Sequence, residues 1–255
     1  MPFLDVAGAK AHYAHRRPVP ASRPPVVFIH GAGGTHQHWL HQVRDIPHSP
    51  TYALDLPGHG RSEGTGRDSI TAYGDWLVAF LDAAGVEQAV LVGHSMGGGI
   101  AQDVALRYPT RLAGLGLVAT GARLRVVPAI LDGIHQDLET AVRLICDFAF
   151  GPEAPPEMVR LGRRQMGDIP PEVLYGDFVA CDTFDAMERL GEIAAPTFVL
   201  CGTQDHLTPL KYSVYLRDRI KGATLHLVEG AGHMIMVEQP QSVSQTLTAF
   251  LEKLG

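Results

Sequence analysis

Residues 90–99 read Val-Leu-Val-Gly-His-Ser-Met-Gly-Gly-Gly, and this stretch decides how the rest of the chain is interpreted. An apolar run ends at Gly93, and residues 99–108 have helical periodicity. The pattern is therefore G-x-S-x-G between a strand and a helix. Side chains at Gly93 or Gly97 would collide across so sharp a turn, and the turn leaves the Ser95 hydroxyl exposed at a helix N-terminus that favours negative charge. We predict that Ser95 is a nucleophile.

The composition is that of an ordinary globular protein, with 45% apolar and 19% charged residues in 255. A formal net charge of −6 provides no basic field, so nucleic acid is not an expected partner. The sequence has no run of membrane-spanning length and no signal-peptide pattern. Cys146, Cys181 and Cys201 lack metal-like spacing and cannot all pair, so we expect reduced thiols. These features together predict a cytoplasmic protein that binds no membrane.

Short apolar runs alternate with segments of helical periodicity, which is typical of an α/β fold with a mostly parallel sheet. We expect strands over 3–6, 11–16, 26–29, 52–54, 90–92, 112–119, 196–201 and 223–228. We expect helices over 70–84, 99–108, 210–220 and 240–254. A further helix near residue 39 would be anchored to the core by Trp39.

The alternation stops between residues 121 and 190, where apolar helical patches cover 127–138 and 141–150. We interpret 121–190 as a helical cap inserted into a core made of residues 1–120 and 191–255. Six large apolar side chains of the cap could line a pocket facing Ser95, although for each one alone packing in the core of the cap is the commoner case. They are Phe148, Phe150, Met158, Met166, Phe178 and Met187.

Groups able to perform acyl transfer follow several predicted strands, and in a parallel sheet ligands bind at the carboxyl ends of strands. A serine hydroxyl needs an adjacent base, and the base needs a third group to orient it. We expect His233 to accept the Ser95 proton and Asp205 to orient the imidazole. The glycine-rich loop 30–34 can bring its backbone close to a ligand, so the N–H groups of Ala32 and Met96 are the expected oxyanion donors.

Alternatives exist for the acid and for the base. Glu229 lies close to His233 and is the second choice after Asp205, which has glycine before it and proline after it in its loop. His94 adjoins the serine but points differently from it, so we expect a supporting role there. His206 is the neighbour of the proposed acid.

The remaining histidines also need an interpretation. His59 lies in a turn with proline and two glycines, where a structural role is commoner than catalysis. His36, His38 and His41 invite a metal hypothesis, but the first two would diverge on a helix and no acidic residue is near them in sequence. We therefore expect no metal and no cofactor.

With these residues in place, the chain resembles an α/β-hydrolase of the single-domain, cap-bearing type that includes many bacterial carboxylesterases. The resemblance runs from residue 26 to the last helix, and its motifs are residues 30–34, 55–62, 93–97, 202–205 and 232–233. It implies an eight-stranded, mostly parallel sheet. It also implies a catalytic triad of Ser95, Asp205 and His233.

The resemblance leaves several activities open. A serine nucleophile separates the chain from epoxide hydrolases and haloalkane dehalogenases, which resemble this pattern with aspartate at that position. Our main hypothesis is a serine hydrolase that cleaves small, largely apolar carboxylic esters through an acyl-enzyme on Ser95, as a monomer or a homodimer. The alternatives are a lactonase, a thioesterase, a non-catalytic ligand-binding receptor, or a C–C bond hydrolase. The last would need an inward arginine, and the candidates are Arg123, Arg125, Arg163 and Arg164.

Overall fold

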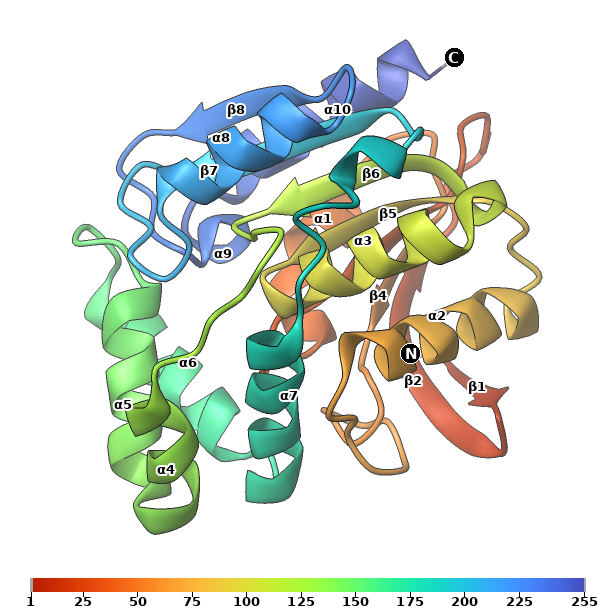
Figure 1. Ribbon diagram of the computed structural model, residues 1–255. Coiled ribbons are helices and arrows are strands. Elements are labelled where there is room, and N and C mark those ends of the chain that lie inside the picture. The colour runs from red at the N-terminus through yellow and green to blue at the C-terminus, as the bar shows by residue number, and fades with distance from the viewer. Residues whose placement is uncertain (1, 255) are drawn as a thin grey trace.

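A computed structural model describes residues 2–254 and shows one eight-stranded sheet (Figure 1). The strand order is β1-β2-β4-β3-β5-β6-β7-β8. The strands are β1 (Phe3–Val6), β2 (Ala9–Arg16), β3 (Val26–Ile29), β4 (Thr51–Leu54), β5 (Ala89–His94), β6 (Leu112–Val118), β7 (Thr197–Gly202) and β8 (Thr224–Val228). The pairs β1–β2 and β2–β4 are antiparallel, and the other pairs are parallel. The predicted mostly parallel, eight-stranded α/β fold is confirmed.

Helices cover both faces of the sheet, so its central strands are apolar throughout rather than alternating. The helices outside the segment between β6 and β7 are α1 (Leu40–Asp45), α2 (Ile70–Ala83), α3 (Met96–Arg107), α8 (Leu210–Arg219), α9 (Ile235–Glu238) and α10 (Pro240–Lys253). Val27, Ile29 and Leu91 pack in one core with α2, α3 and α8. Phe28 and Val92 point the other way, into a second core with α1, α9 and α10. Successive side chains of a strand point to opposite faces of the sheet, so packing in both cores fixes the position of each central strand.

Strand register brings the loops of the predicted site together. Ile29 at the end of β3 lies opposite Gly93 of β5, so the 30–34 loop and Ser95 leave the sheet at neighbouring points. Gly202, which ends β7, lies opposite Val228, which ends β8. The loops that follow these two strands carry Asp205 and His233.

Helix α3 begins at Met96, three residues earlier than the periodicity predicted. The Ser95 carbonyl already accepts hydrogen bonds from the N–H groups of Gly98 and Gly99. A glycine run has no apolar periodicity, so the sequence pattern could not locate this first turn. The prediction for the start of the helix was therefore wrong.

A helical insertion, defined here as residues 119–196, lies between β6 and β7 and extends beyond the carboxyl ends of the strands (Figure 1). Its helices are α4 (Pro128–Gln136), α5 (Leu138–Ala149), α6 (Pro156–Gly167) and α7 (Pro171–Thr183). The buried side chains of Ile134, Ile145 and Leu174 belong to a separate apolar core of the insertion. Residues 1 and 255, the ends of the core predicted from the sequence, lie outside the described residues.

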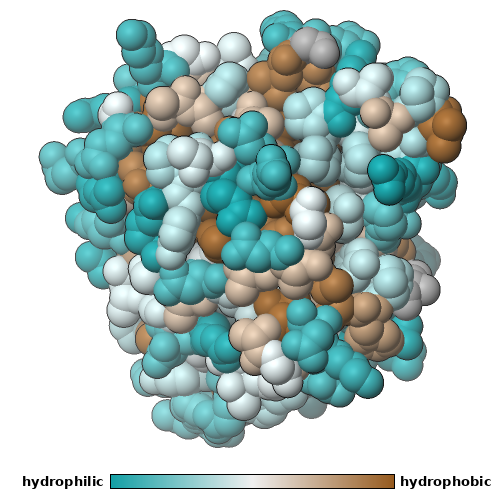
Figure 2. Space-filling model, turned by 90° about the vertical axis from the view of Figure 1, so that its right-hand side faces the viewer, coloured by the Kyte–Doolittle hydropathy of each residue, from teal (hydrophilic) through white to brown (hydrophobic). Residues whose placement is uncertain are grey.

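The face on the right-hand side of Figure 1, where β1 and α2 lie, is turned to the viewer in Figure 2. Hydrophobic side chains on this face form scattered groups among hydrophilic ones. None of the helices within residues 2–254 combines the length and apolarity needed to cross a membrane.

Trp39 ends the 3-10 helix η1 (His36–Trp39) and is fully buried, stacked on Phe28 with ring centroids 4.9 Å apart. We predict that Trp39→Ala lowers the free energy of unfolding by about 3–5 kcal/mol, because it removes a large side chain from a packed core. Urea unfolding measures the change. Leu227→Ala, at a half-exposed position, should stay within about 0.5 kcal/mol of the wild type. Equal losses in the two variants would contradict this.

Candidate active site

Ser95 joins β5 to α3 with φ 52° and ψ −117°, a backbone conformation that residues other than glycine rarely adopt. Two hydrogen bonds hold its backbone: its N–H donates to the Val118 carbonyl at 3.0 Å, and its carbonyl accepts from Thr120 Oγ1 at 2.7 Å. A Cβ on Gly93 would lie 2.1 Å from the Gly97 carbonyl oxygen, so the turn requires glycine there. Surrounding structure thus enforces the strained serine.

His233 and Asp205 form a buried pair beside this turn. His233 Nδ1 lies 3.0 Å from Asp205 Oδ2, and the two residues are 4% and 5% exposed. A carboxylate can only accept, so the proton of the neutral imidazole is on Nδ1 and the lone pair is on Nε2. The Asp205 carboxylate also accepts from the N–H groups of Leu207 and Thr208 and from the Thr208 hydroxyl. Burial would raise the pKa of Asp205, but His233 and the Thr208 donors outweigh it and hold that pKa below its usual range.

The alternative acid Glu229 lies outside the cavities at Ser95, whereas His94 and His206 line them without forming a buried acid–base pair. The Glu229 carboxylate accepts from Thr203 Oγ1 at 3.3 Å at an exposed position, and His206 is exposed. His94 Nε2 donates to the His233 carbonyl at 3.0 Å. Burial and the neighbouring His233 hold the pKa of His94 well below its usual value, so the ring is neutral and supports the histidine loop.

The loop that carries His233 is tied to the helical insertion. The N–H of His233 donates to the Ala149 carbonyl at 2.8 Å, at the end of α5. The Glu238 carboxylate accepts from the N–H groups of both Gly151 and Gly232, each at 3.0 Å. A Cβ on Gly232 would lie 2.2 Å from Gly151 N, so this glycine permits the close approach.

The loop 30–34 is held so that the Ala32 N–H can face a ligand. The Gly31 carbonyl accepts from Gly34 N–H at 3.0 Å and from His30 Nδ1–H at 2.8 Å. Because C=O and N–H of a trans peptide point in opposite directions, the Ala32 N–H points away from these two donors. His30 Nε2 accepts from Leu56 N–H, and burial lowers the pKa of His30 to about 3, so this ring stays neutral.

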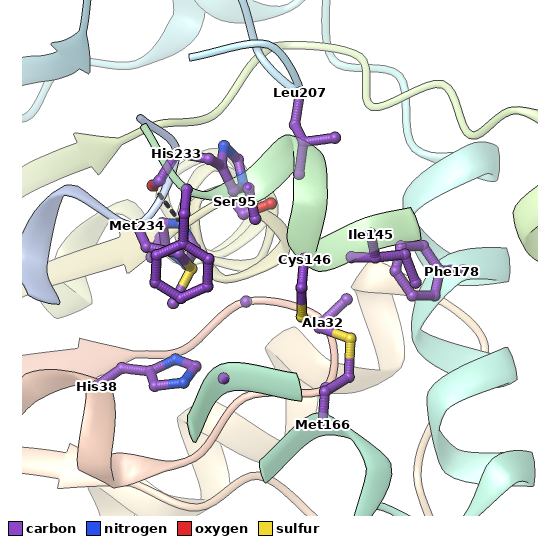
Figure 3. Close-up of a pocket in the computed structure, with 16 residues that line it drawn as sticks. Ala32, His38, Ser95, Ile145, Cys146, Met166, Phe178, Leu207, His233 and Met234 are labelled. Carbon is purple, nitrogen blue, oxygen red and sulfur yellow. Dashed lines mark hydrogen bonds between the residues drawn. The ribbon is translucent and has the colours of Figure 1, made fainter. Parts of the chain in front are cut away.

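Two cavities share Ser95, His233 and Ala32 among their lining residues, and Phe178 and Leu207 also line both. The small lobe is the cavity of about 70 Å³ that the loop 30–34, Cys146 and Met166 close. Figure 3 shows Cys146 and Met166 projecting into it from the insertion. The large lobe is the cavity of about 330 Å³ whose further lining residues include Leu124–Val127, Ile130, Phe148 and Tyr212.

Of the six apolar side chains considered for a pocket facing Ser95, four line one or both lobes: Phe148, Phe150, Met166 and Phe178. Met158 and Met187 line neither lobe, and Met187 packs against the main core. All three cysteines are free and buried.

One acidic residue, Asp55, lies close to the clustered histidines in space although it is distant from them in sequence. Asp55 accepts hydrogen bonds from His36 Nδ1 at 2.8 Å and from His12 Nδ1 at 2.7 Å. It also accepts from the N–H groups of His36 and Arg61. The expectation that no acidic residue lies near these histidines was therefore wrong for the folded chain. The Asp55 carboxylate already accepts hydrogen bonds from four donors.

Asp177 is a further residue at the site that was not among the predicted ones, and it accepts from Gly33 N–H in the loop 30–34. The two residues are 144 positions apart, and the sequence carried no signal for the contact. His59, which we considered a structural turn residue, bonds to Asp177 rather than to Ser95.

Comparison with known proteins adds independent information. The family model for the alpha/beta hydrolase fold matches residues 24–240. The structure of a thermophilic esterase is 36% identical, with a TM-score of 0.87, over 100% of this chain and 98% of that one. A pimeloyl-[acyl-carrier protein] methyl ester esterase of Pectobacterium carotovorum is 27% identical over 91% of this chain and 96% of its own length. A putative carbamate hydrolase RutD of Caulobacter vibrioides is 30% identical over 94% and 95%.

The eight-stranded sheet and the strained serine turn agree with this family match. The chain belongs to the α/β-hydrolase family.

Proposed function

We propose that this protein hydrolyses carboxylic esters with a short acyl group through an acyl-enzyme on Ser95. The observation that carries the proposal is the buried Asp205–His233 pair, whose histidine lines the same cavity as the strained Ser95. A serine hydroxyl is a weak nucleophile until an oriented base removes its proton.

The reaction follows from these groups. His233 Nε2 takes the proton of Ser95 Oγ as Oγ attacks the ester carbonyl. The N–H groups of Ala32 and Met96 bind the oxyanion; one such donor typically contributes about 2.7–4 kcal/mol. His233 then protonates the departing alkoxide, and the alcohol leaves. A water molecule, deprotonated by His233, attacks the acyl-enzyme, and its breakdown releases the acid and restores Ser95.

The unequal lobes support a short acyl group for esters with a bulky alcohol. At about 10–15 Å³ for each water-sized group, the small lobe has room for roughly five to seven such groups. A p-nitrophenyl ring is too large for it and must occupy the large lobe. The acyl chain of a p-nitrophenyl ester is then confined to the small lobe.

An ester substrate is also favoured over a substrate for C–C bond cleavage, which would need an inward arginine for its carboxylate. Arg123 and Arg163 each pair with an aspartate, and Arg164 is exposed. Arg125 lines the large lobe, but its guanidinium donates to the Asp182 carbonyl at 3.0 Å and its side chain is 61% exposed. No arginine is among the described lining residues of the small lobe. Esterases among the similar proteins point in the same direction.

The first prediction concerns chain length. Across p-nitrophenyl esters from acetate to laurate, we expect kcat/KM to peak between acetate and butyrate and to be at least about tenfold lower for laurate, because the small lobe cannot hold a long chain. Ser95→Ala should reduce kcat about 10⁴-fold or more. Unchanged turnover in Ser95→Ala would overturn the proposal, and a peak at laurate would overturn the lobe assignment.

The second prediction concerns the acid. Asp205→Asn should lower kcat roughly 10³- to 10⁴-fold, because an amide cannot accept all the hydrogen bonds that now hold the His233 tautomer. Glu229→Gln, the matched change at the exposed neighbouring acid, should leave kcat unchanged. Steady-state kinetics with p-nitrophenyl acetate measures both, and the reverse ranking would make Glu229 the acid.

The third prediction concerns the wall of the small lobe. Met166→Ala should move the acyl optimum to longer chains, because it removes a side chain that closes the lobe. Met158→Ala, on the same helix α6 but outside both lobes, is the control. The ester series measures both optima. An equal shift in the two variants would contradict the assignment.

A further inference from the structure

The Asp177 carboxylate, on α7 of the insertion, is fully buried and accepts three hydrogen bonds. Its Oδ2 accepts from Gly33 N–H and from His59 Nε2, each at 2.8 Å. Its Oδ1 accepts from the Tyr73 hydroxyl at 2.6 Å. None of the acyl-transfer steps above uses Asp177, yet it bonds directly to the backbone beside Ala32.

His59 makes this carboxylate part of a buried ion pair. Its Nδ1 faces the Pro57 carbonyl at 3.0 Å, and its Nε2 faces Asp177. Both partners can only accept, so both ring nitrogens carry protons and the ring is cationic. Burial alone would lower the pKa of His59, but Asp177 and the Pro57 carbonyl outweigh it and raise that pKa. The imidazolium and the carboxylate attract each other at 2.8 Å, and a charged acceptor makes the stronger hydrogen bond to Gly33.

The hydrogen bond from Gly33 N–H to Asp177 holds the second of the two peptides that flank Ala32. The peptide before Ala32 is held through the Gly31 carbonyl, which accepts from Gly34 and His30. The peptide after Ala32 is held through Gly33 N–H, which donates to Asp177. Since each peptide is planar, these contacts on both sides determine where the Ala32 N–H points.

Helix α7 also packs directly on this loop. Gly33 has φ +64°, and a Cβ there would lie 2.7 Å from Leu174 Cδ1. Leu174 and Asp177 are three residues apart and therefore share one face of α7. One helix face thus supplies both the contact above Gly33 and the acceptor for its N–H.

We propose that Asp177 is a positioning residue for the oxyanion hole, through which α7 of the insertion holds Gly33 and aims the Ala32 N–H at the substrate. The oxyanion hole is complete only when α7 is seated on the loop. This inference rests on the proposed acyl transfer at Ser95.

The test is Asp177→Ala, assayed with p-nitrophenyl acetate and with butylboronic acid, which forms a tetrahedral adduct on the serine. A misdirected donor weakens binding of the tetrahedral state more than binding of the ester. We expect kcat to fall about 10- to 100-fold with KM within about threefold of the wild type. The inhibition constant of the boronic acid should rise by the same factor as kcat/KM falls.

The control is His12→Gln, which removes the comparable buried imidazole–carboxylate bond to Asp55. It should lower the melting temperature and leave kcat and the boronic acid affinity unchanged. If Asp177→Ala does not fold, Asp177→Asn carries the test. Its neutral amide weakens the bond to Gly33, and a parallel fall of about 3- to 10-fold in kcat and boronic acid affinity is expected.

Wild-type kcat and boronic acid affinity in the folded variant, with only a lowered melting temperature, would overturn the positioning role. Failure of the proposed function is a separate result. In that case the wild-type protein itself shows neither turnover of p-nitrophenyl acetate nor inhibition by the boronic acid.

Discussion

The left-handed backbone of Ser95 is the constraint on which the rest of the structure depends. A strained residue persists only where its surroundings leave no other conformation. Here Gly93 and Gly97 allow the strand and the helix to approach closely. Hydrogen bonds with Val118, at the end of β6, and with Thr120, in the loop after it, hold the backbone of the serine. The parallel sheet therefore aims one hydroxyl into the cavity and fixes the origin of α3 behind it.

Each histidine around this serine has a chemical state set by its partners. His30 and His94 are buried among groups that keep them neutral, while His59 faces two acceptors and is cationic. His233 differs because one nitrogen is fixed by Asp205 and the residue still lines the cavity. Burial, charge and hydrogen bonding thus separate a candidate base from supporting rings that have the same side chain.

The helical insertion contributes to the geometry of the site as well as to its walls. Through Ala149 it holds the backbone of His233, and through Asp177 it holds Gly33. Both contacts join segments distant in sequence. A site built this way depends on how the insertion is seated, and the unequal lobes around Ser95 are formed by the same packing.

Much of this was predictable from the sequence because the signals are local. Apolar runs gave the strands, and strand-end motifs placed Ser95, Asp205 and His233 at one edge of the sheet. Asp177 was not predictable, since a lone aspartate in a helical segment does not indicate from which distant N–H it accepts. Apolar character alone does not tell a pocket wall from a packed core, so the sequence could not separate Met158 and Met187 from the residues that line the lobes.

The central claim is that Ser95 is the nucleophile, and covalent labelling tests it most directly. A p-nitrophenyl alkylphosphonate should add one phosphonyl group per chain, and peptide mass spectrometry should place that group on Ser95. The Ser95→Ala variant should remain unlabelled under the same conditions. Absence of an adduct on the wild type, or an adduct that persists in the variant, would contradict the account.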